Sequence, residues 1–130
     1  MMPENYQLLI TKLTERTVNR DALWEKTSRE EEFRLQLNSS VITIDKWFDS
    51  FEGKVYYDLA IYNEDGHQID KIGCSDTTDG YKLLKALHSA VSRIHYKVDE
   101  TFKSIFEELD SANKIGKVSP PTHDDSDIPF

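Results

Sequence analysis

Hydrophobic and polar residues alternate in the middle of the chain, which is the pattern of half-buried β-strands. The clearest alternation spans residues 54–63, with Val55, Tyr57, Leu59 and Ile61 on one face and Tyr56, Asp58, Ala60 and Tyr62 on the other. Shorter runs predict strands at 33–37, 41–48 and 67–73. Because the connections between these strands are short, we expect a four-stranded antiparallel meander with one buried face.

Apolar residues at three- and four-residue spacing predict a helix on each side of these strands. The first helix is expected at residues 3–19, and the polar stretch that follows is expected to be a connection held by Trp24, in which residues 23–27 could be extended. The second apolar stripe has no proline in it and consists of Leu84, Leu87, Val91, Ile94, Val98, Phe102, Ile105 and Leu109. It predicts one long C-terminal helix packed on the sheet, whose projecting apolar end favours a homodimer.

The order of these elements indicates an α+β fold: an N-terminal helix, a four-stranded antiparallel β-meander, a long C-terminal helix and a disordered acidic tail. We expect residues 1–111 to form the α+β domain. Residues 112–130 contain Gly116, Pro120 and Pro121 and are expected to form a flexible linker with an acidic tip.

Charge and composition narrow the class of protein. The chain has 130 residues and a net charge of -8, so it is a poor general ligand for phosphate backbones. No signal peptide or membrane-spanning run is visible, and a cytoplasmic location without membrane contact is expected. Cys74 stands alone in the sequence and is expected to be a half-buried thiol.

Two groups of polar residues could carry chemistry. His88, His95 and Asp99 share one flank of the predicted long helix, but seven residues separate the histidines, about 10 Å along the helix, so edging the core is favoured over holding a metal. The carboxylates near the sheet edge, Glu64, Asp65, Asp70, Asp76 and Asp79, fit turns and helix caps better than catalysis. We therefore predict no enzyme, catalytic residue, metal or cofactor.

Two surfaces could contact nucleic acid. Trp47, Tyr56 and Tyr62 are expected on the sheet face away from the core, where aromatic rings can stack on single-stranded bases. Asp45 and Asp58 on the same face repel phosphate, so packing or dimerisation is favoured there. A basic stripe on the long helix consists of Lys82, Lys85, Arg93, Lys97 and Lys103, and an ordinary solvated helix face is favoured over a weak contact with nucleic acid.

The last seven residues combine Asp124, Asp125 and Asp127 with the apolar triplet Ile128-Pro129-Phe130. Pro129 keeps Ile128 extended, and Phe130 offers an aromatic ring next to a carboxylate. The aspartates can steer such a peptide toward a basic rim. The matching receptor is an apolar pocket with an arginine or lysine at its mouth.

This tip resembles the C-terminal tip of bacterial single-stranded DNA-binding protein (SSB), an acidic run that ends in Ile-Pro-Phe. The resemblance covers residues 124–130, and Ser126 interrupts the acids. It implies that Ile128, Pro129 and Phe130 bind replication, recombination and repair proteins, with the aspartates assisting. The body lacks the pattern of the five-stranded OB barrel, so the resemblance does not extend to coating DNA.

Three hypotheses follow. The first is a non-enzymatic interaction protein that docks its tip into SSB-tail-binding pockets, either to recruit the partner or to compete with SSB. The second is a diverged single-stranded DNA-binding protein. The third is an acidic inhibitor or immunity-type protein whose body binds a basic partner.

Overall fold

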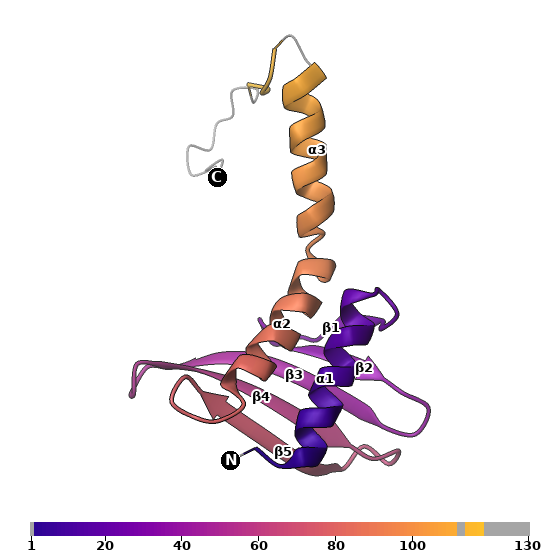
Figure 1. Ribbon diagram of the computed structural model, residues 1–130, viewed down its shortest axis with the longest axis vertical. Helices are drawn as coiled ribbons and strands as arrows, with labels where there is room; N and C mark the ends of the chain where they lie inside the picture. Colours follow the sequence, from indigo (N-terminus) through magenta and orange to yellow (C-terminus); the bar gives the residue numbers. More distant parts are fainter. Residues whose placement is uncertain (1, 112–113, 119–130) are drawn as a thin grey trace. The chain divides into compact units, whose positions relative to one another are not determined.

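The computed structural model describes residues 2–111 and 114–118, so the predicted tip at 124–130 lies outside the described residues. The elements follow one another along the chain as α1 (Glu4–Val18), β1 (Trp24–Lys26), β2 (Phe33–Gln36), β3 (Val41–Asp49), β4 (Lys54–Tyr62), β5 (Gln68–Ser75), α2 (Tyr81–His95) and α3 (Val98–Ser111). The predicted α+β class, with an N-terminal helix and an antiparallel meander, is confirmed (Figure 1).

The sheet has five strands in the order β1-β2-β3-β4-β5, so the prediction of four strands was wrong. The additional strand is β1, whose Trp24 lies opposite Leu35 of β2. The indole Nε1 of Trp24 donates a hydrogen bond to the Thr17 hydroxyl, at 3.0 Å. This bond ties the connection after α1 back to the helix, as expected for Trp24, and places the three residues of β1 along the edge of β2.

The C-terminal helix is interrupted, so the prediction of one long helix was also wrong. α2 ends at His95, and Lys97 has the left-handed backbone conformation, with φ 54°. The amide of Tyr96 donates to the Ser92 carbonyl at 3.0 Å, and that of Lys97 donates to the Ile94 carbonyl at 3.2 Å. A residue with positive φ cannot continue an α-helix. α3 therefore begins anew at Val98.

Two compact units are distinguished along the chain, one up to Asp99 and one from Glu100 onward. Most of α3 belongs to the second unit, and none of its side chains is buried. Its exposed apolar residues are Phe102, Ile105, Phe106 and Leu109. The homodimer expected from this apolar stripe stays a prediction.

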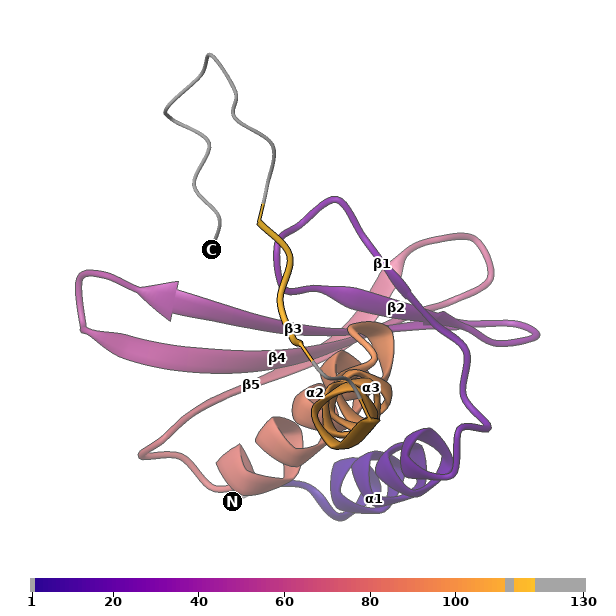
Figure 2. The same ribbon diagram turned by 90° about the horizontal axis from the view of Figure 1, so that it is seen from above.

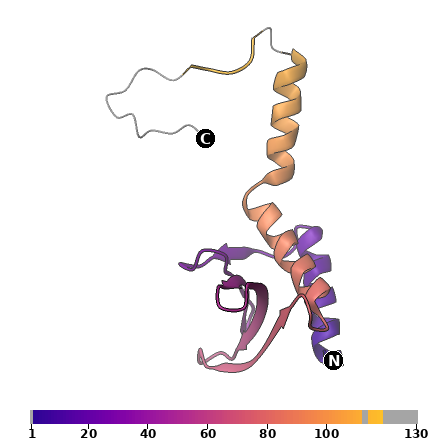
Figure 3. The same ribbon diagram turned by 90° about the vertical axis from the view of Figure 1, so that its left-hand side faces the viewer.

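The first unit has its core between the sheet and two helices. α1 and α2 lie on the same face of the sheet, and the opposite face carries no helix of this unit (Figures 2 and 3). Fully buried side chains from helices and strands meet in this layer: Ile10, Phe33, Ile44, Leu59, Leu84, Leu87 and Val91. The alternation that predicted the inward face of residues 54–63 is confirmed by Tyr57 and Leu59, both buried.

Cys74 is also buried in this layer, with 1% of its surface exposed. Its thiol donates a hydrogen bond to the Asp79 carbonyl, at 3.1 Å. Burial, followed by the charges of Asp58 and Asp79, raises the pKa of the thiol. Because the thiolate is the reactive form, Cys74 is a poor nucleophile in the folded protein.

Candidate functional site

The helix-free face of the sheet carries an aromatic pair near the end of β3. Trp47 and Tyr56 lie directly opposite each other on β3 and β4. Their rings are stacked, with centroids 4.8 Å apart and planes 15° from parallel. The Tyr56 hydroxyl donates to the Glu52 carboxylate, and this hydrogen bond raises the pKa of Tyr56. The pair is thus a fixed aromatic platform next to carboxylates.

Two carboxylates stand beside this platform in the next row of the sheet. Asp45 and Asp58 are directly opposite each other, an arrangement that is unfavourable between like charges. Each is compensated separately. Arg29 lies 2.8 Å from Asp45. Asp58 accepts a hydrogen bond from the Trp47 indole at 2.8 Å and has the Lys71 ammonium 3.5 Å away.

These contacts bury Asp45, of which 6% is exposed, although it lies on the sheet face away from the core, as the sequence predicted. The alternation of β3 was read correctly, since Asp45 does point away from the core. The burial comes from Arg29, which approaches from the loop between β1 and β2. Nothing local to β3 indicates this partner, so sequence reasoning missed Arg29 and Lys71 as part of the site.

Gly73 allows Asp58 to take this position. A Cβ atom on Gly73 would lie 2.5 Å from Oδ1 of Asp58, closer than real Cβ contacts come. We expect Gly73→Ala to displace the Asp58 carboxylate and to lower the free energy of unfolding by about 1–3 kcal/mol, as in other overpacked sites. The Trp47 indole would lose its acceptor, so tryptophan emission should also change.

Urea unfolding of a double-mutant cycle with Asp58→Ala measures this effect. In the Asp58→Ala background the added methyl group has room, and Gly73→Ala should then cost much less. Equal costs in the two backgrounds would show that Asp58 and Gly73 do not interact in this way.

A gap in strand pairing lies next to the aromatic platform. β2 pairs with β3 only as far as Phe33 opposite Ile44. From Asp45 to Asp49, β3 pairs with β4, and no described residue pairs with its other side. This part of the β3–β4 hairpin projects past the neighbouring strands (Figure 2). The lengths of the strands predicted at 33–37 and 41–48 already contained this mismatch.

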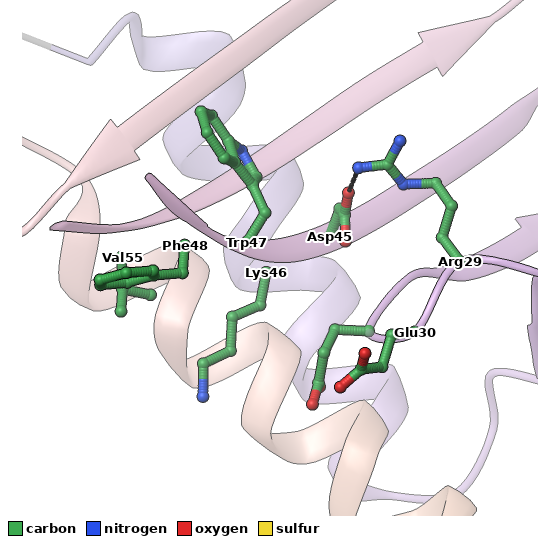
Figure 4. A pocket seen from close by; sticks show the side chains of 8 residues that line it. Arg29, Glu30, Asp45, Lys46, Trp47, Phe48 and Val55 are labelled. Atoms are coloured by element: carbon green, nitrogen blue, oxygen red, sulfur yellow. Dashed lines mark ion pairs between the residues drawn. The ribbon is translucent and has the colours of Figure 1, made fainter. Parts of the chain in front are cut away.

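A hollow of about 480 Å³ follows this unpaired edge (Figure 4), and we call it the edge groove. Phe48 lies against Val55 at one end, and Glu30 lies near the other. Trp47 and Asp45 point to the opposite side of the strand from Lys46. The groove is lined by Arg29, Glu30, Glu31, Asp45, Lys46, Trp47, Phe48 and Val55.

The loop that forms one wall of the edge groove is held at three points. The Thr27 amide donates to the Glu32 carbonyl at 3.0 Å, which closes the loop at its base. Arg29 pairs with Asp45 on one side of the sheet. On the other side, the buried His88 ring places Nε2 2.7 Å from the Glu31 carbonyl. The wall is therefore fixed by contacts to β3 and α2.

The histidines and Asp99 of the predicted long helix have structural partners. His88 is buried, as expected for a residue at the edge of the core, and His95 packs on Phe33 with ring centroids 5.2 Å apart. Asp99 pairs with Arg93 at 2.7 Å. Among the described residues, no three His, Cys, Asp or Glu side chains are grouped closely enough to hold a metal ion.

The structure brings together part of the predicted nucleic-acid surfaces. Tyr62 lies six residues beyond Tyr56 on β4, about 20 Å away, and does not join the aromatic platform. The described lysines of the basic stripe are exposed, whereas Arg93 is engaged by Asp99. Lys97 lies in the break between α2 and α3.

None of the described helices is long and apolar enough to cross a membrane.

The fold and the site thus define an α+β protein with a helix-covered core and an acidic, aromatic surface at one sheet edge. No family model, curated protein or solved structure matches the chain.

Proposed function

We propose that this is a non-enzymatic interaction protein that docks the tip at 124–130 into SSB-tail-binding pockets of replication, recombination and repair proteins. The sequence of the tip carries this proposal: three aspartates followed by Ile128-Pro129-Phe130. Docking would recruit the partner to the body of this protein, or it would displace SSB from the partner. The exposed side chains at 114–118 are consistent with a tether that holds no part of the core.

The expected affinity follows from the chemistry of the tip. Burying the Phe130 ring contributes about 1.5–3 kcal/mol. A charged hydrogen bond to the carboxylate of Phe130 adds about 1.5–3 kcal/mol. Ile128 contributes further, and ordering the tail costs part of the gain. The balance corresponds to roughly micromolar binding, which becomes effective when the tip is tethered or present in several copies.

Binding to a purified protein that recognises the SSB tip tests the proposal. Surface plasmon resonance should give micromolar binding for the full chain and at least a tenfold loss for Phe130→Ala or for one glycine added after Phe130, which moves the carboxylate. Val118→Ala changes an exposed linker residue and should bind like the original. A synthetic SSB tip peptide should compete. Equal binding by the glycine-extended and original chains, or no binding by either, would contradict the proposal.

The alternative of a diverged single-stranded DNA-binding protein is favoured by one observation, the stacked Trp47 and Tyr56 rings on the helix-free face. Asp45 and Asp58 beside them oppose binding of phosphate. Titration with an oligonucleotide at low salt should quench Trp47 emission if bases stack on the platform. Unchanged emission at high micromolar DNA would argue strongly against this alternative.

The third alternative is an acidic inhibitor or immunity-type protein that binds a basic partner through its body. The net charge of -8 and the carboxylates around the aromatic platform favour it. Removing residues 119–130 distinguishes it from the tip-docking function. Partner binding would survive the removal if the body binds, and would be lost if the tip does.

A further inference from the structure

The unpaired edge of β3 has the features of a strand-docking site. We propose that the edge groove receives an extended peptide from a partner protein, paired antiparallel with Asp45–Asp49 and alternating aliphatic with basic residues. Adding a strand to an exposed sheet edge is a common mode of peptide recognition, in which backbone hydrogen bonds supply affinity and alternate side chains supply specificity.

The hydrogen bonds of the sheet identify the backbone groups that are available. The Leu37 amide donates to the Ser40 carbonyl at 2.8 Å, so even-numbered residues of β3 point their N–H and C=O groups toward β2. Ile42 and Ile44 fill this role opposite Leu35 and Phe33. By the same alternation, the N–H and C=O groups of residues 46 and 48 point toward the edge where β2 no longer runs.

Side chains on the helix side of this edge favour aliphatic residues in the partner. Phe48 is 61% exposed and lies over Val55, the residue directly opposite it on β4 (Figure 4). The side chain of Lys46 lies on the same side and offers its aliphatic stem. A partner residue opposite either position would therefore pack against carbon atoms, and valine or isoleucine would suit an added strand.

Side chains on the other side of the same edge favour basic residues. Asp45, Trp47 and Asp49 point there, and Trp47 offers its ring face to a cation. Asp58 and Glu52 lie close by through their hydrogen bonds to Trp47 and Tyr56. Arg29 and Lys71 compensate two of these carboxylates, and Lys54 lies directly opposite Asp49, which leaves an excess of one negative charge.

The length of the gap sets the size of the ligand. Five residues of β3 span about 17 Å. The peptide acetyl-Lys-Val-Lys-Val-Lys-amide matches this gap, with valines opposite Phe48 and Lys46 and lysines opposite Asp49, Trp47 and Asp45. In this register the two valine residues exchange backbone hydrogen bonds with β3, and the lysine residues do not.

Fluorescence titration of the full chain carrying Trp24→Phe tests the proposal, because Trp47 is then the remaining tryptophan. We expect saturable changes in emission with the unmodified peptide and with a version in which the backbone nitrogen of every lysine is methylated. A version N-methylated at both valines should bind at least tenfold more weakly, since it loses the donors that face the edge. The acidic peptide acetyl-Glu-Val-Glu-Val-Glu-amide should not bind.

Protein variants test the same contact from the other side. Lys46→Pro removes the edge N–H group at a position where an edge strand tolerates proline, whereas Lys46→Ala keeps it. The proline variant should lose at least tenfold in affinity relative to the alanine variant. If the proline variant does not fold, the two N-methylated peptides still decide the question with the Trp24→Phe protein.

Three results would overturn the proposal: equal binding by both N-methylated peptides, no binding of the unmodified peptide at millimolar concentration, or equal binding by the folded proline and alanine variants. A dimeric mass in sedimentation, with peptide binding that weakens as protein concentration rises, would assign the edge to a second copy instead. A chain ending at residue 118 should bind the peptide unchanged, so this test is independent of the tip.

Discussion

Replacing Phe33 by alanine is expected to lower the free energy of unfolding by about 3–5 kcal/mol. Phe33 is fully buried. It is the first residue of β2 and lies opposite Ile44, next to the unpaired part of β3. Its ring packs edge-on against three other rings, those of His88, His95 and Tyr96. Truncation would remove the contacts that join the sheet to the C-terminal end of α2 and would leave a cavity.

Urea unfolding followed by circular dichroism measures this loss. Phe51→Ala is the matched control, because it deletes the same atoms from a side chain that is 99% exposed in the β3–β4 turn. The control should change the free energy of unfolding by less than about 0.5 kcal/mol. Similar losses for the two variants would mean that Phe33 does not occupy the core described above.

The break after α2 leads to the second large effect. Leu87 and Leu109 belong to the same apolar stripe in the sequence, but the break at Lys97 places them on different helices, α2 and α3. In the structure Leu87 is fully buried, whereas Leu109 is 51% exposed. We expect Leu87→Ala to cost about 2–5 kcal/mol and Leu109→Ala to cost less than about 1 kcal/mol.

The same unfolding experiment, run at low micromolar protein concentration, compares the two leucine variants. Low concentration matters because a partner covering α3 would add to the cost of Leu109→Ala. A cost for Leu109→Ala as large as that for Leu87→Ala, independent of protein concentration, would contradict the exposed position of Leu109 on α3.

The sequence was sufficient to predict the helices and strands in which apolar residues recur at a regular spacing. Alternation over residues 54–63 gave the strand and its inward face. In the turn after this strand the Asn63 carboxamide accepts from the amides of Asp65 and His67, and Gly66 has φ 85°, a conformation that suits glycine. The spacing of Tyr6, Leu9, Ile10 and Leu13 indicated one face of α1, on which Tyr6, Ile10 and Leu13 are buried and Leu9 is partly buried. Each of these patterns lies within one segment of the chain, and the structure it predicts depends mainly on that segment.

Features that depend on single residues or distant contacts were not predictable in this way. The apolar stripe of α2 and α3 continues through Lys97 without proline or glycine, so its periodicity hides a break made by one residue with positive φ. β1 is three residues long, and its Trp24 resembles an isolated anchor until β2 is placed beside it. The burial of Asp45 depends on Arg29, which lies in another segment.

The candidate site shows the same division. Strand alternation placed Trp47 and Tyr56 on the same face of the sheet, and the register of the β3–β4 hairpin in the structure sets them directly opposite each other. Tyr62 lies on the same face of the sheet but six residues farther along β4. Alternation predicts the face of a side chain, and it does not predict the distance between two side chains on that face. The edge groove required a comparison of neighbouring strand lengths, which alternation within one strand does not provide.

The burial of Cys74 has a practical consequence for spectroscopy. The sequence contains no other cysteine, and this thiol is covered, with a raised pKa. A cysteine introduced at an exposed site, such as Phe51 in the β3–β4 turn, can therefore react with a maleimide dye while Cys74 stays unmodified. A variant with one introduced cysteine thus accepts one label at a chosen position, and distances from the projecting hairpin to a labelled ligand become measurable by energy transfer.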